Sequence, residues 1–285
     1  MQEDIRLFLN FLAKEKKCSK NTLDAYHNDL SQLADYITGA KANDLPGYDG
    51  GDLSEEHLAS YMLNLREKSY TVSTIARKIA AARTFLKFMA GRGKVNADLA
   101  PMLAAPKVNK ALPQALSVPE IQRLLAETAR IPTLDAKRDQ AMLELLYATG
   151  LLASELMSLN VDNMDLGQSC LTITNPQGRS RKIPLDKRIK EMIQEYIASV
   201  RINLLTSDKE KALFLNQRGE RLTRQGFWQL VQGYAVMAGL TVKVTPRTIR
   251  HSYAVHKLHN GADIHSIQEM LGHAHISTTK AYKQV

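Results

Sequence analysis

The sequence predicts a mainly α-helical protein made of two domains. Three features support this fold class: apolar residues recur at helical spacing through residues 1–90, the composition changes at 91–113, and helical patterns return in 114–285 around two short strand-like runs. A chain of 285 residues is long for one hydrophobic core and sufficient for two.

Four helices are expected in the first domain, near residues 3–16, 19–38, 53–68 and 72–90. The first of them places Ile5, Phe8 and Leu12 on one side. Ser19 and Ser54 stand where the N-caps of the second and third helices belong. Strand signals are missing from this stretch, so we expect an all-helical domain.

The fourth helix combines an apolar face with a basic one. Its basic face is expected to contain Arg77, Lys78, Arg83 and Lys87. Two interpretations stay open for this face. It is either a solvated helix surface or a surface that contacts the phosphates of a nucleic acid.

The segment 91–113 gathers Gly, Pro, Asn and Lys, and is predicted to be a linker. After it, the run from Ser117 to Glu120 combines an N-cap serine, an early proline and a glutamate three residues after the serine, which predicts a helix start. A small antiparallel sheet is expected from Cys170–Thr174 and Lys182–Leu185. Further helices are expected near 136–148, 186–203, 222–239, 246–259 and 263–272.

Charge favours a polyanionic partner. The net charge is +9, and residues 1–105 hold 14 Lys and Arg against 13 Asp and Glu, so almost all of the excess lies in 106–285. Cys18 and Cys170 are too few for a disulfide framework, and we expect them to be reduced thiols of a cytoplasmic protein. The sequence contains no apolar run of the length that a membrane span requires, so no membrane partner is expected.

Several motifs follow one another in a specific order. Toward the C-terminus stand Thr245-Pro-Arg-Thr-Ile-Arg-His251, Leu271-Gly-His-Ala274 and Ile276-Ser-Thr-Thr-Lys-Ala-Tyr282. Earlier come Tyr147-Ala-Thr-Gly-Leu-Leu-Ala-Ser-Glu155 and Ser19-x-x-Thr22-x-x-x-Tyr26-x-x-Asp29. Together they resemble the tyrosine recombinases, or phage integrase family, and within it the Xer-like members.

This resemblance implies a two-domain DNA clamp. Residues 1–90 would be a four-helix, SAM-like core-binding domain, 91–113 a linker, and 114–285 a mainly helical catalytic domain with a small antiparallel sheet. It implies site-specific recombination or integration of double-stranded DNA without a cofactor or metal. The chemistry is an attack of a tyrosine hydroxyl on a backbone phosphate that forms a 3′-phosphotyrosyl intermediate.

Part of the family's catalytic set is present. By resemblance, Tyr282 is the nucleophile, Arg250 the second arginine and His273 the second histidine, while Arg247 stands where the first histidine belongs. Taken alone, each of these residues has an ordinary structural explanation; a histidine, for example, is favoured at a helix C-terminus. Their order and spacing make them candidate catalytic residues.

Two positions depart from the family pattern. Leu152 stands where the first arginine is expected, and Pro176 where the hairpin lysine is expected. Loss of one preorganised donor costs ~10²–10³ in rate. The candidate replacements are Arg247 and the hairpin residues Arg179, Arg181 and Lys182.

DNA contacts are expected from both domains. The candidates are Lys20, Asn21, Thr22, Arg77, Lys78, Arg83, Lys87, Arg179 and Arg181. Family members usually continue past the tyrosine into a helix that docks on a neighbouring subunit, and this sequence ends at Val285. A homo-oligomer on DNA, dimer or tetramer, is therefore an open expectation.

Three classes of function remain. The protein is a recombinase that cuts and rejoins DNA through Tyr282, a DNA-binding regulator or partner that has lost the chemistry, or a basic helical protein that acts on something other than DNA. A metal site among the remaining histidines is a weaker alternative, because no Cys or carboxylate completes a ligand set.

Overall fold

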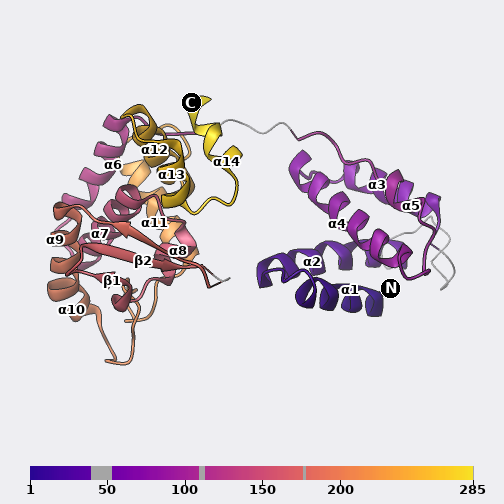
Figure 1. The fold of residues 1–285 in the computed structure, drawn as a ribbon, viewed down its shortest axis with the longest axis horizontal. Coiled ribbons are helices and arrows are strands. Elements are labelled where there is room, and N and C mark those ends of the chain that lie inside the picture. The colour runs from indigo at the N-terminus through magenta and orange to yellow at the C-terminus, as the bar shows by residue number, and fades with distance from the viewer. Residues whose placement is uncertain (40–52, 109–112, 176–177, 285) are drawn as a thin grey trace. The chain divides into compact units, whose positions relative to one another are not determined.

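The protein is described here by a computed structural model that covers residues 1–39, 53–108, 113–175 and 178–284. The chain divides into two compact units, Met1–Lys110 and Ala111–Val285 (Figure 1). Each unit has a hydrophobic core of its own. The described residues are mainly helical with one small antiparallel sheet, which confirms the predicted fold class.

The first unit is helical throughout its described part. Phe8 is fully buried at its centre, with ring centroids 5.6 Å from Tyr26 and 5.5 Å from Phe85. The hydroxyls of Ser19 and Thr71 accept hydrogen bonds from the backbone N–H groups three residues later, which starts the second and fourth helices there. The helices are α1 (Gln2–Lys14), α2 (Lys20–Ile37), α3 (Glu55–Glu67), α4 (Val72–Ala90) and α5 (Leu99–Met102).

Part of the segment 91–113, predicted to be a linker, belongs to the first unit. Residues 99–102 form the short helix α5, and Leu99, Ala100 and Leu103 are buried in the core of the first unit. The helix is only four residues long and contains Pro101, so helical periodicity is too short to be recognised there. Residues 109–112 of the segment lie outside the described residues.

The second unit is built of short and medium helices around α7, which is buried on most sides. Ser117 and Glu120 form the predicted capping box at the start of α6. The helices are α6 (Val118–Ala129), α7 (Leu134–Thr149), α8 (Ala153–Ser158), α9 (Lys187–Glu195), α10 (Ile202–Leu204), α11 (Arg224–Met237), α12 (Pro246–His259), α13 (Ile264–Leu271) and α14 (Ile276–Lys280). Residues Tyr196–Arg201 join α9 to α10 as a π-helical segment, so the predicted helix at 186–203 is continuous but irregular.

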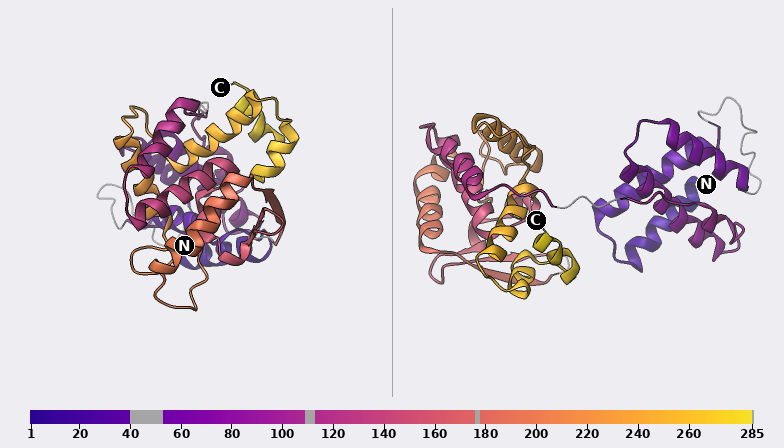
Figure 2. Two further views of the ribbon diagram at one scale, coloured as in Figure 1. Left: turned by 90° about the vertical axis from the view of Figure 1, so that its left-hand side faces the viewer. Right: turned by 90° about the horizontal axis from the view of Figure 1, so that it is seen from above.

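The sheet contains β1 (Met164–Asp165), β2 (Cys170–Thr174) and β3 (Ser180–Pro184), in the order β1-β2-β3 with antiparallel pairing. β3 starts two residues before the predicted strand and pairs Arg181 with Ile173 and Ile183 with Leu171. Because side chains alternate along a strand, Arg181 shares a face with the buried Ile183, whereas Lys182 belongs to the opposite face. β3 lies beside α13 (Figure 1; Figure 2).

In the part of the chain that the structure describes, no helix has the length and apolar character needed to cross a membrane.

Candidate active site

Tyr282 lies in a short 3-10 turn (Ala281–Gln284) directly after α14. Its side chain is 3% exposed and packs in a small cluster with Tyr253 and Leu271. Burial raises the pKa of the phenol, while the charges of Arg250 and Arg247 and a hydrogen bond with Arg250 oppose that rise. The phenol is therefore protonated at neutral pH, and it needs a proton acceptor and nearby cations to become a nucleophile.

Arg250 is buried on α12, the helix that starts at Thr245 and Pro246. Its guanidinium donates to the carbonyls of Gly150 at 2.8 Å and Leu271 at 2.7 Å. Gly150 ends α7 with φ at +62°, and a Cβ there would come within 2.4 Å of the Tyr253 ring, so no other residue fits without displacement. Arg250 thus joins the ends of α7 and α13 beside Tyr282.

His273 follows α13 and faces the same arginine. Its Nε2 lies 3.1 Å from Nη2 of Arg250, and its Nδ1 lies 2.9 Å from Oγ1 of the buried Thr279. A guanidinium only donates, so Nε2 accepts and Nδ1 carries the proton. Burial, followed by the charge of Arg250, lowers the pKa of His273 to about 4, which leaves the ring neutral at pH 7. The ring is near-parallel to that of Tyr282, with centroids 6.2 Å apart.

A second histidine lies beside the tyrosine, and sequence reasoning did not select it as a site residue. The ring of His251 meets Tyr282 edge-on at 5.3 Å, and its Nε2 accepts a hydrogen bond from Nε of the exposed Arg247 at 3.2 Å. Burial, then the charges of Arg247 and Arg250, lowers its pKa to about 4. The signal was the spacing of four residues from Arg247, which places both on one helix face.

Glu155 is a further residue that sequence reasoning left without a role. Its carboxylate accepts two hydrogen bonds from Arg181, at 2.7 and 2.9 Å, and lies 3.9 Å from Nη1 of Arg250. It also accepts from the backbone N–H of Leu152 at 2.9 Å. The side chain of Leu152 is 46% exposed at the start of α8. Position 152, where the family pattern has an arginine, therefore offers Glu155 only its backbone N–H.

The family of the chain follows from comparison with known proteins. The family model described as Phage integrase family matches residues 114–285, and that described as Phage integrase, N-terminal SAM-like domain, matches residues 5–93. Tyrosine recombinase XerC of Roseiflexus sp. (strain RS-1) is 41% identical over 287 residues, covering 100% of this chain and 90% of that protein. The chain belongs to the phage integrase family. Its identity to XerC and XerD proteins over the full chain shows that it is a Xer-like tyrosine recombinase.

Other similarities agree with this membership. Tyrosine recombinase XerD of Listeria monocytogenes serotype 4b (strain F2365) is 36% identical over 286 residues, covering 100% of this chain and 95% of that protein. The crystal structure of XerH site-specific recombinase bound to difH substrate, in a pre-cleavage complex, has a TM-score of 0.74 at 18% identity and covers 99% of this chain and 82% of that chain. The second similarity concerns the fold alone.

The hairpin residues of the recombinase lie in different surroundings. Arg181, predicted to contact DNA, has its guanidinium between Glu155 and the carbonyl of Met270, at 3.0 Å from the latter. Arg179 is exposed, and Lys182 donates to Gln168 at 3.3 Å on the outer face of the sheet. Pro176 lies outside the described residues.

One candidate for DNA contact in the first unit needs correction. Lys78 is 3% exposed, and its amino group donates to Oδ1 of Asp29 at 3.1 Å and Oε1 of Gln32 at 2.7 Å. Arg77 also pairs with Asp29, although half of its side chain is exposed. The prediction that Lys78 lies on an exposed basic face was wrong, because a lysine paired with a buried aspartate of another helix cannot be told from a surface lysine by periodicity.

The other candidates of the first unit lie at or near the surface. Lys87 is exposed and Arg83 half-buried on α4. Lys20, Asn21 and Thr22 are exposed at the start of α2, where Thr22 contacts the capping Ser19 at 2.9 Å. Exposed donors at a helix start suit a phosphate contact, which stays a prediction.

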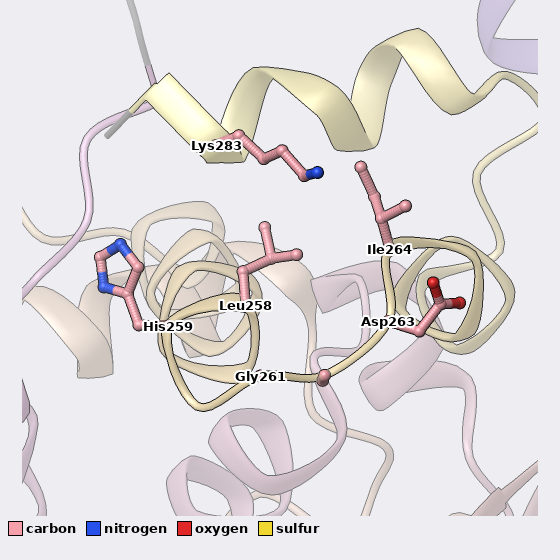
Figure 3. Close-up of a pocket in the computed structure, with 7 residues that line it drawn as sticks. Leu258, His259, Gly261, Asp263, Ile264 and Lys283 are labelled. Atoms are coloured by element: carbon pink, nitrogen blue, oxygen red, sulfur yellow. The ribbon is translucent and has the colours of Figure 1, made fainter.

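A shallow groove of about 410 Å³ lies near the tyrosine segment but outside the arginine and histidine cluster (Figure 3). Lys283, next to Tyr282 in sequence, extends over Leu258 toward Ile264 (Figure 3). The groove is lined by Leu258, His259, Gly261, Ala262, Asp263, Ile264 and Lys283. Among the described residues, no three His, Cys, Asp or Glu side chains gather in a way that could hold a metal ion.

Proposed function

We propose that this chain is a site-specific recombinase that cleaves and rejoins double-stranded DNA through a 3′-phosphotyrosyl bond on Tyr282. The observation that carries the proposal is the convergence of Tyr282 with Arg250, Arg247 and two neutral histidines. A buried phenol surrounded by guanidinium groups suits attack on a phosphate, since the cations stabilise the charge that develops on its oxygens.

In the proposed step, Oη of Tyr282 forms a bond to phosphorus and the bond from phosphorus to the 5′ oxygen breaks. The phenolic proton passes to Nε2 of His273, whose lone pair becomes available when Arg250 turns from it to the phosphate, while the proton of the ring stays on Nδ1. The same proton then passes to the departing 5′ oxygen, so that the step balances without an outside acid. Arg250 and Arg247 neutralise the phosphate oxygens in the transition state.

DNA as the partner is supported by the net charge of +9 and by relatives and neighbours that act on DNA. One solved structure of similar fold is a lambda integrase dimer bound to a COC′ core site, which supports a homo-oligomer on DNA in our proposal. We also propose that residues 1–90 and 114–285 contact DNA as a core-binding and a catalytic domain. The DNA substrate and two reduced cysteines fit a cytoplasmic protein.

The second candidate function is a DNA-binding partner that no longer cleaves. The exposed aliphatic side chain of Leu152 favours it, because leucine cannot donate to a phosphate where the family pattern has an arginine. The two candidates make the same prediction for DNA binding and opposite predictions for covalent chemistry.

A covalent-adduct assay decides between them. The duplex that the protein protects from nuclease would be rebuilt with a nick beside the cleavage position, so that the cut strand cannot be rejoined. We expect wild-type protein to form a denaturant-resistant adduct and Tyr282→Phe to bind the duplex without forming one. Binding without an adduct in the wild-type protein would support the non-cleaving partner, and a tyrosine-independent adduct would refute Tyr282 as nucleophile.

A further inference from the structure

Three charged side chains form a chain beside Tyr282 that starts at the hairpin. Arg181 reaches from β3 and donates to both oxygens of Glu155, at 2.7 and 2.9 Å. The same carboxylate lies 3.9 Å from Arg250. All three side chains are largely shielded from solvent, with Arg181 and Glu155 each 16% exposed. Pairs of this kind interact more strongly than exposed ones, because solvent screens them less.

The two arginines also hold the end of α13 together. Nε of Arg181 donates to the carbonyl of Met270 at 3.0 Å, and Nη2 of Arg250 donates to the next carbonyl, Leu271, at 2.7 Å. Gly272 is packed so closely that a Cβ there would lie 2.9 Å from Nη1 of Arg181. The position of His273, one residue later, therefore depends on both guanidinium groups.

Glu155 would compete for Arg250 if Arg181 were absent. A shielded carboxylate without a cation beside it is costly, and the nearest remaining cation is Arg250 at 3.9 Å. A carboxylate–guanidinium pair is among the stronger hydrogen-bonded pairs, so Arg250 would be drawn toward Glu155. The guanidinium would then be less available to a phosphate and to Nε2 of His273.

The start of α8 explains why the cation comes from the hairpin. An arginine at position 152 would stand three residues before Glu155 and could pair with it along the same helix. Leu152 offers only its backbone N–H to the carboxylate. Arg181 reaches Glu155 because strand alternation turns it to the same face as the buried Ile183.

We propose that Arg181 is a positioning residue of the recombinase, which neutralises Glu155 and holds the Met270–His273 turn so that Arg250 is not drawn to Glu155 and can bind the scissile phosphate. This inference rests on the proposed function. Of the candidate replacements for the missing arginine, Arg181 is the one that pairs with Glu155, the carboxylate that also lies 3.9 Å from Arg250. Its own guanidinium is engaged by protein groups, so its effect on the phosphate passes through Arg250.

The test is a double-mutant cycle of Arg181→Gln and Glu155→Gln, read by the single-turnover rate of adduct formation and by DNA affinity. Arg181→Gln is expected to lower the rate ~10²-fold, as for loss of a preorganised donor, with little change in affinity. Glu155→Gln added to it should restore at least about tenfold of the rate, because the competitor for Arg250 is gone. The amide oxygen that Glu155→Gln introduces can still accept from the N–H of Leu152.

Controls separate positioning from folding. Arg188→Gln breaks a second bidentate pair, with Glu144 at 2.7 and 2.8 Å, away from the site, and its rate should stay within about twofold of wild type. Thermal unfolding would verify that each variant is folded, and Arg181→Met, which also removes the charge, replaces Arg181→Gln if that variant unfolds. Arg181→Lys, which keeps the charge, should retain more of the rate than either. A double mutant as slow as Arg181→Gln would overturn the proposal.

A second readout needs no cleavage. Histidine signals in nuclear magnetic resonance report the pKa of His273, which burial lowers most, followed by the charges of Arg250, His251 and Arg181. In Arg181→Gln this pKa should rise from about 4 toward its ordinary value as Arg250 moves away, and it should fall again in the double mutant. An unchanged pKa in Arg181→Gln would overturn the inference. Absence of any adduct from the wild-type protein would instead overturn the proposed function.

Discussion

Arg250 donates from Nη2 to Nε2 of His273 over 3.1 Å, and this contact determines which ring nitrogen of the histidine carries the proton. Because a guanidinium has no lone pair to offer, the proton resides on Nδ1 and is donated to Thr279. The lone pair of Nε2 accepts from Arg250, and the ring lies near-parallel to that of Tyr282. The protonation of His273 is therefore set by its two neighbours and can be changed through either of them.

Thr279 should act on catalysis through the tautomer of His273. Thr279→Val keeps the side-chain shape and removes the acceptor for the Nδ1 proton, so the ring loses one of the two contacts that hold its proton on Nδ1. We expect adduct formation to fall ~10-fold or more, while Thr279→Ser stays near wild type. Nitrogen chemical shifts of His273 would report the tautomer directly. Thr278→Val, at an exposed neighbour, is the control.

Acid should destabilise the protein through the two histidines beside Tyr282. Burial and neighbouring arginines lower the pKa of both His251 and His273 to about 4. The unfolded chain binds more protons between its ordinary histidine pKa, ~6.5, and the folded value, so the free energy of unfolding falls as the pH falls through that window. Each histidine should contribute on the order of 1 kcal/mol, because both are only half-buried and solvent screens the effect.

Urea unfolding at about pH 7 and about pH 5 measures this loss. His273→Gln and His251→Gln should each make the free energy of unfolding less dependent on pH. His275→Gln, at an exposed position, is the control. The same pH dependence in all four proteins would show that the two histidines do not cause it.

The two lysines of α4 should affect different properties, Lys78 the stability of the fold and Lys87 the binding of DNA. Lys78→Met leaves Asp29 with one cation and is expected to lower the free energy of unfolding by about 3 kcal/mol, as for a broken buried pair. Lys87→Ala, at an exposed position, should leave stability within about 0.5 kcal/mol and reduce the salt dependence of DNA binding by about one unit of slope. Affinity titrations at several salt concentrations, with urea unfolding, measure both. An unchanged slope in Lys87→Ala would remove that residue from the DNA interface.

Restoring the family's arginine and lysine at positions 152 and 176 should increase DNA cleavage more than DNA binding. Leu152→Arg together with Pro176→Lys adds two cations whose effect is expected in the transition state, so adduct formation should rise while affinity changes little. Tyr282→Phe in that background should abolish the adduct. A denaturing gel of the reaction on the nicked duplex measures the adduct in each variant. A rise in affinity alone would show that the new cations only strengthen phosphate binding.

Local patterns are sufficient for much of the fold. The helices at residues 72–90 and 246–259 have the bounds that the sequence predicts, and so does the strand Cys170–Thr174. The caps at Ser19 and Ser117 need only neighbouring residues, since the hydroxyl reaches an N–H three positions later. The sequence predicts the start of β3 at Lys182 because Ser180 and Arg181 have no strand preference of their own; their pairing with Thr174 and Ile173 makes them strand.

By itself the sequence determined the fold class, the family and the identity of the candidate nucleophile, because these depend on periodicity, order and spacing along the chain. The tertiary structure decided which charges are available. It buried Lys78 against Asp29, brought His251 to Tyr282, and turned Arg181 to Glu155 rather than outward. The physical reason is that a charge is defined by its partners and its solvent, and residues 49 or 26 positions apart become partners only when the chain folds.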